Sequence, residues 1–120
     1  NLRFSTEHTS SALISHIEQA LSSARVDYAC EWHVSGEPFL TVEPELITVV
    51  QDCVKQVTGI LPDASTGGGT SDGRFIAPTG AQVVEIGPCN ATIHKLNERI
   101  RITDIEKLSA IYELILQRLL

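Results

Sequence analysis

Apolar residues recur at helical spacing in two stretches of the first half of the chain. The first stretch predicts a helix after Ser10 and Ser11, whose hydroxyl groups can cap its start. Its apolar stripe consists of Leu13, Ile14, Ile17, Ala20, Leu21 and Ala24. The second stretch predicts a helix from Pro44, because proline suits the first helical position, with Gly59 as its C-terminal stop. Its expected buried face is Leu46, Val50, Cys53, Val54 and Val57.

A third helical stretch occupies the C-terminal end of the chain. We expect it to begin at Thr103, because Thr103 and Glu106 have the Thr-x-x-Glu spacing of a capping box. Its apolar positions follow at three- and four-residue intervals, which favours a helix that packs in the core. They are Ile105, Leu108, Ile111, Tyr112, Ile115, Leu116 and Leu119.

Three shorter stretches have the pattern of β-strands. Residues 2–5 are strand-like, residues 26–34 alternate apolar side chains with polar or small ones, and residues 81–86 form an apolar, partly β-branched run. Residues 61–73 are rich in Gly, Ser, Thr and Asp and predict a loop. The predicted order is β-α-β-α-loop-β-α, so we expect a fold of the α/β or α+β class.

Composition narrows the possible functions. The chain has 120 residues, 42% of them hydrophobic and 20% charged, as in ordinary globular domains. Its formal net charge of −6 disfavours non-specific binding to nucleic acid. No apolar run approaches the ~20 residues that span a bilayer, so we expect no membrane association. We also find no signal-peptide pattern.

Two sulfur-containing residue types give further expectations. Cys30, Cys53 and Cys89 are odd in number and show no Cys-x-x-Cys spacing, so we expect thiols in a reducing cytosol rather than a disulfide framework or a cysteine zinc site. The chain contains no methionine. We therefore expect it to be part of a longer polypeptide.

The first candidate for chemistry is the glycine-rich stretch from Thr66 to Arg74. Three consecutive glycines contribute no side-chain packing, so they suit a place where backbone N–H groups approach a ligand closely. The guanidinium of Arg74 suits a carboxylate. The alternative is a surface loop that binds nothing. Neither the phosphate-binding P-loop pattern nor the dinucleotide-binding Gly-x-Gly-x-x-Gly pattern fits this stretch.

Ser71 offers a different chemistry. Residues 69–73 match Gly-x-Ser-x-Gly, the nucleophile elbow of serine hydrolases, with His94 as a candidate base. That elbow needs a strand before it and a helix after it. Here a polar loop precedes Ser71. The residues after it, 74–78, end in Pro78 and cannot begin a long helix. A serine hydrolase remains an alternative.

His94 and Arg3 are the remaining candidates. His94 follows a predicted buried strand within the polar residues 90–98, where an imidazole can be a metal ligand or an acid–base group, or can have a structural role. The other histidines, His8, His16 and His33, share no ligand spacing. Arg3 lies between Leu2 and Phe4 as a surface cation, or as a buried one that needs an anionic partner such as a substrate.

These motifs together resemble a known family. Residues 66–77 (Thr-Gly-Gly-Gly-Thr-Ser-Asp-Gly-Arg-Phe-Ile-Ala) and residues 80–98, which contain Asn-Ala-Thr-Ile-His-Lys, closely resemble signatures of the bacterial succinyl-diaminopimelate desuccinylases. Residues 1–5 and 35–39 fit the same family in the same order. The family belongs to a wider clan of di-zinc aminoacylases and carboxypeptidases, and the resemblance spans essentially the whole chain.

The resemblance implies a domain organisation. Family members have an α/β, exopeptidase-like catalytic domain that holds two zinc ions and an inserted α+β lid domain that forms a homodimer. This chain would be the C-terminal third of such a subunit. Residues 1–37 would be the second half of the lid, and residues 38–120 the C-terminal part of the catalytic domain.

The resemblance also implies roles for single residues. His94 matches a zinc ligand, whereas the substrate-binding positions of the family fall on Arg3, Gly69, Thr70, Arg74 and Asn90. The implied reaction is zinc-dependent hydrolysis of the amide of N-succinyl-L,L-2,6-diaminopimelate to succinate and L,L-diaminopimelate, for lysine and cell-wall synthesis in the cytoplasm.

No catalytic residue falls in this chain by the same resemblance. In family members, the other zinc ligands, the glutamate base and a histidine from the partner subunit lie in the segment before the third that matches this chain. We therefore expect the isolated chain to be inactive and to hold no stoichiometric zinc. A stand-alone module for anion binding or dimerisation is the alternative.

Overall fold

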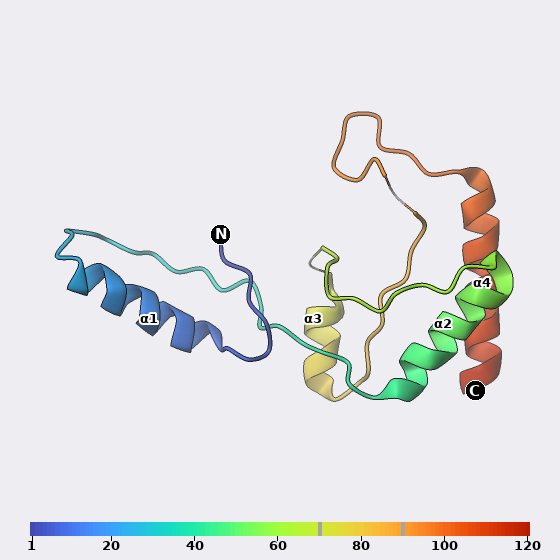
Figure 1. Ribbon diagram of the computed structural model, residues 1–120, viewed down its shortest axis with the longest axis horizontal. Helices are drawn as coiled ribbons and strands as arrows, with labels where there is room; N and C mark the ends of the chain where they lie inside the picture. Colours follow the sequence, from blue (N-terminus) through green and yellow to red (C-terminus); the bar gives the residue numbers. More distant parts are fainter. Residues whose placement is uncertain (70, 90) are drawn as a thin grey trace. The chain divides into compact units, whose positions relative to one another are not determined.

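The regular structure of this protein is helical. A computed structural model describes residues 1–69, 71–89 and 91–120. Its elements in chain order are α1 (Ser10–Ser23), α2 (Pro44–Thr58), α3 (Gly73–Ile76), the 3-10 helix η1 (Ala77–Thr79) and α4 (Ile102–Leu119) (Figure 1). None of the helices in these ranges combines the length and apolar character that a bilayer-spanning segment requires.

The strands predicted at residues 2–5, 26–34 and 81–86 do not form. All three segments lie in the described part of the chain, and none of them has strand structure there. A strand exists only when its backbone N–H and C=O groups pair with a neighbouring strand, whereas a helix satisfies its own. Because these segments do not pair with one another, the β-sheet expected for an α/β fold is absent from the described residues.

The three predicted helices form at the expected positions, but the N-termini of two of them differ from the prediction. Gly59 ends α2 with a left-handed φ of 75°. The cap of α1 is Thr9, whose hydroxyl accepts from the N–H of Ala12, and not Ser10 or Ser11. The capping box at Thr103 is wrong because α4 begins at Ile102 after an uncapped Arg101, which places Thr103 inside the first turn.

The chain divides into two compact units, which are described separately. Unit 1 comprises residues 1–41 and 70–81, and unit 2 comprises residues 42–69 and 82–120. The domain boundary expected after residue 37 stays a prediction.

In unit 1, the segment after α1 returns along the helix and is held to it by side chains. The hydroxyl of Tyr28 donates to the backbone oxygen of Glu18 at 3.2 Å, and the indole N–H of Trp32 donates to the Glu18 carboxylate at 2.9 Å. Apolar side chains of the same segment stay exposed, among them Val26 and Val34. Polar contacts of Glu18 therefore hold this segment where a strand ladder was expected.

In unit 2, α2 and α4 pack against each other and form the core (Figure 1). The buried residues are Val50 and Cys53 of α2 and Ile111 and Ile115 of α4. The rest of the expected buried face of α2 is half-buried around them, in agreement with the helical stripe. Those residues are Leu46, Val54 and Val57.

One flank of the apolar stripe of α4 is exposed, contrary to expectation. Large apolar side chains on this flank remain accessible, because α2 packs against the neighbouring face of α4 and no other helix in the described part of unit 2 covers them. They are Ile105, Tyr112, Leu116 and Leu119. The apolar stripe of α4 is thus wider than the surface that α2 covers.

The residues expected as a buried strand contact the same core. Val84 and Ile86 pack against it from alternate positions, and the hydroxyl of Tyr112 donates to the backbone oxygen of Ile86 at 3.0 Å. The segment keeps the two-residue side-chain period of a strand without the backbone ladder. All three cysteines are free, Cys53 in this core and Cys30 and Cys89 exposed.

The helix pair yields a stability prediction with a matched control. Replacing the buried Ile111 by Ala should lower the free energy of unfolding by about 2–5 kcal/mol, because it removes apolar atoms from the contact with α2. The same change at Ile105, 53% exposed on the same helix, should alter it by less than about 1 kcal/mol. Urea unfolding followed by circular dichroism measures both. Equal losses would show that the packing of α2 against α4 does not form the core.

Candidate functional site

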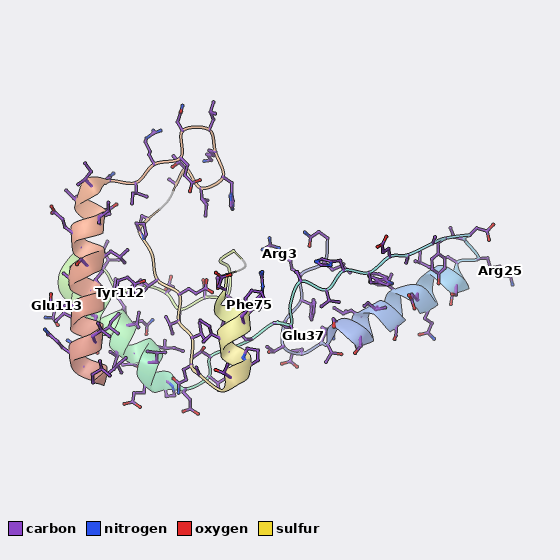
Figure 2. The ribbon with its side chains drawn as sticks, turned by 180° about the vertical axis from the view of Figure 1, so that it is seen from behind. Arg3, Arg25, Glu37, Phe75, Tyr112 and Glu113 are labelled. Carbon is purple, nitrogen blue, oxygen red and sulfur yellow. The ribbon has the colours of Figure 1, made fainter. Side chains whose placement is uncertain are left out.

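Arg74 is the candidate residue with the most defined surroundings. It lies on the short helix α3, half-buried, with its guanidinium carbon 4.6 Å from the ring centroid of Phe75, which Figure 2 labels. Within the described residues, its Nε is the only buried side-chain nitrogen or oxygen without a hydrogen-bond partner. A buried N–H without an acceptor costs about 1–3 kcal/mol. An anionic ligand would remove this cost, because guanidinium groups bind carboxylates well.

Gly36 leaves room for the Arg74 side chain. A Cβ atom at position 36 would lie 2.8 Å from Cδ of Arg74, closer than van der Waals contact allows. The aliphatic part of Arg74 therefore packs on the bare backbone of Gly36. No local pattern in the sequence links positions 36 and 74, so this contact could not be predicted from the sequence.

Glu37, the next residue, anchors the start of α1 (Figure 2). Its carboxylate accepts hydrogen bonds from the backbone N–H of Ser10, at 3.2 Å, and from the Ser10 hydroxyl. A carboxylate at a helix N-terminus also interacts favourably with the helix dipole. Residues 36 and 37 thus contact both Arg74 and α1, which makes them the organising residues of unit 1.

The glycines of the candidate anion loop meet no steric restriction from the described residues. An added Cβ meets nothing within 4 Å at Gly68 or Gly69, and only the Ser65 hydroxyl, at 3.7 Å, at Gly67. None of the three has a positive φ. Their small size therefore serves no contact within the described residues. Thr70, the next candidate, lies outside the described residues.

Ser71 has a structural role in the turn before α3. Its hydroxyl oxygen accepts a hydrogen bond from the N–H of Gly73 at 3.0 Å. No strand precedes Ser71 in residues 61–69, and the helix that follows has only four residues. The strand-turn-helix context of a serine nucleophile is therefore not formed around it.

His94 is exposed, in unit 2, on the loop between residues 91 and 100. Its φ of 60° lies in the left-handed region, as does that of Asn97. Non-glycine residues adopt this region rarely, and mostly where the surrounding structure imposes it. Asn90, the candidate just before this loop, lies outside the described residues.

The described residues contain no group of three metal-binding side chains. Among residues 1–69, 71–89 and 91–120, no group of three or more His, Cys, Asp or Glu side chains is placed to hold a metal ion. Because His94 is exposed, its ring nitrogens are accessible to a metal whose other ligands come from elsewhere. Zinc usually takes three or four protein ligands, so a zinc ion on His94 would need ligands beyond those that the described residues group together.

Arg3 is exposed in unit 1, the unit that also contains Arg74, whereas Gly69 and His94 both belong to unit 2. Each unit therefore contains two of the four described candidate site residues. Arg3 is not buried in this structure, so it matches the surface alternative.

Comparison with known proteins places the chain in a family of hydrolytic enzymes. Residues 5–118 match the model of peptidase family M20/M25/M40. Because the match covers nearly the whole chain, the chain belongs to this family.

The most similar curated relatives share one name. Proteins of Alkalilimnicola ehrlichii and Nitrosococcus oceani are each 56% identical to this chain over 120 residues, and one of Thioalkalivibrio sulfidiphilus is 52% identical. Each is named succinyl-diaminopimelate desuccinylase. The match covers 100% of this chain but 32% of each relative, so the chain spans about a third of their length.

The Gly36 contact yields a prediction with an internal control. Replacing Gly36 by Ala should displace the Arg74 side chain, because the added methyl carbon would lie only 2.8 Å from its Cδ atom. The Arg74 Nε–H resonance should then shift and exchange faster with solvent in ¹⁵N NMR spectra. Replacing Gly69 by Ala should leave that resonance and the thermal midpoint unchanged, since its Cβ meets open space. An unshifted Nε–H signal in Gly36→Ala would contradict the packing of Arg74 on Gly36.

Proposed function

We propose that this chain is the C-terminal part of a zinc-dependent succinyl-diaminopimelate desuccinylase, which hydrolyses N-succinyl-L,L-2,6-diaminopimelate to succinate and L,L-diaminopimelate. The observation that carries the proposal is the identity of 52–56% over the whole chain to three proteins of that name. The proposal includes an α/β catalytic domain completed by the remaining two thirds of the subunit, a homodimer, and a cytoplasmic location.

In this proposal His94 is the zinc ligand that the chain contributes. A neutral imidazole binds zinc through one ring nitrogen, and the exposed position of His94 suits a metal held jointly with ligands from outside this chain. When bound, zinc polarises a carbonyl group and makes water more acidic. By the family resemblance, the group that takes the proton of this water would come from outside this chain.

The substrate would be held by the cationic and glycine-rich residues. Arg74 is the proposed carboxylate-binding residue, because its buried Nε has no partner within the described residues and its stacking on Phe75 limits its motion. Arg3 would bind a second anionic group. Gly69 would let a backbone N–H approach the substrate, since nothing in the described residues crowds it. Thr70 and Asn90 are proposed from the family resemblance alone.

The test uses a chimeric enzyme. The Alkalilimnicola relative, with its matching third replaced by this chain, provides the parts that this sequence lacks. We expect this chimera to release succinate from N-succinyl-L,L-2,6-diaminopimelate and to hold two zinc ions per subunit. His94→Ala should lower kcat at least 10²-fold and remove one zinc, measured by elemental analysis. Retention of both zinc ions and full activity in His94→Ala would refute the proposed role of His94.

The isolated chain should behave differently from the chimera. Because its described residues group no three metal-binding side chains, we expect no stoichiometric zinc and no succinate release. Native mass spectrometry after incubation with zinc and removal of the excess measures the metal content. Two zinc ions bound to each isolated chain would overturn the assignment of the missing ligands to another segment.

A further inference from the structure

A side-chain hydroxyl group links the two ends of the loop that carries His94. The Oγ1 atom of Thr92 accepts a hydrogen bond from the N–H of Arg99 at 2.9 Å and donates one to the carbonyl oxygen of Arg99 at 3.0 Å. One side chain thus pairs with both backbone polar groups of a residue seven positions further along the chain. This is the pairing that a strand partner would make, provided here by a side chain.

Further hydrogen bonds lie within the loop. The N–H of Lys95 donates to the backbone oxygen of Thr92 at 2.9 Å, which closes a turn around His94. The ammonium group of Lys95 donates to the backbone oxygen of Ala91, also at 2.9 Å. The turn and the base of the loop therefore share Thr92.

Apolar packing does not hold this loop within the described residues. Ile93 is 52% exposed and Leu96 is 92% exposed. The hydrophobic effect therefore contributes little to the conformation of residues 92–99, and hydrogen bonds must define it. Loss of the Thr92 hydroxyl would remove the two hydrogen bonds between Thr92 and Arg99.

The backbone of His94 needs such support. Its φ of 60° is unfavourable for a residue with a Cβ atom and persists only where neighbouring contacts impose it. Contacts of this kind near His94 are the turn from Thr92 to Lys95 and the hydrogen bonds between Thr92 and Arg99. Both begin at Thr92, two residues before the imidazole.

We propose that Thr92 is a positioning residue for metal binding: its hydroxyl closes the loop of residues 92–99 and so fixes the place at which the His94 imidazole is presented to zinc. This inference rests on the proposed function, in which His94 is a zinc ligand. Thr92 touches neither metal nor substrate in this account. It acts by reducing the number of conformations that the loop must give up when the metal binds.

The test compares two substitutions at Thr92 in the chimeric enzyme. Thr92→Val keeps the shape of the side chain and removes the hydroxyl, whereas Thr92→Ser keeps the hydroxyl and removes only the methyl group. Groups that orient a metal ligand typically change metal affinity 10–100-fold. We expect Thr92→Val to weaken zinc affinity by at least tenfold, measured by competition with a fluorescent chelator, and Thr92→Ser to remain within about threefold of the parent.

A second readout is independent of the metal. In the zinc-free chimera, hydrogen exchange of the Arg99 amide should be at least tenfold faster in Thr92→Val than in Thr92→Ser, because that N–H loses its acceptor. Unchanged zinc affinity in Thr92→Val would overturn the proposal, whether or not exchange is faster. Equal loss in both variants would overturn it as well, since the hydroxyl would not be the group responsible.

His94→Ala separates this inference from the proposed function. If His94→Ala removes one zinc but Thr92→Val does not weaken zinc binding, only the role of Thr92 is refuted. If His94→Ala leaves both zinc ions bound, the proposed function of His94 fails, and the positioning role of Thr92 fails with it.

Discussion

A backbone hydrogen bond needs a partner, and in this chain that requirement decides which segments have regular structure. Helices α1, α2 and α4 pair their N–H and C=O groups within a single segment, so they form wherever the apolar spacing and the end residues allow. Residues 26–34 have the side-chain period of a strand but no strand structure. Their contacts are instead made by single side chains, such as the Trp32 indole on the Glu18 carboxylate.

In unit 2 as well, side-chain hydrogen bonds hold backbone groups that a strand ladder would otherwise pair. The Tyr112 hydroxyl donates to the backbone oxygen of Ile86, and the Thr92 hydroxyl hydrogen-bonds to both the backbone N–H and the backbone C=O of Arg99. Apolar packing is concentrated in the contact of α2 with α4, while the outer side of α4 and the tip of the His94 loop expose apolar side chains. These exposed surfaces agree with a chain that spans about a third of the length of its relatives.

How much could be predicted from the sequence follows from the range of each interaction. Pro44 and Gly59 define α2 correctly because both act on their own neighbours along the chain. The N-terminus of α4 differs by one residue from the prediction at Thr103, because α4 begins at Ile102 without a side-chain cap. For the candidate site, residue type and motif alone were enough to single out Arg74 and His94. The supporting contacts of Gly36 and Thr92 were not predictable, because each joins positions that no local pattern links.

The central claim is that the imidazole of His94 is one ligand of a metal centre whose other ligands lie outside this chain. A crystal structure of the zinc-loaded chimera tests it most directly. The account predicts a ring nitrogen of His94 at about 2.0–2.1 Å from a zinc ion, with the hydroxyl of Thr92 still bonded to Arg99. An imidazole that faces solvent, with zinc held wholly by other residues, would contradict it.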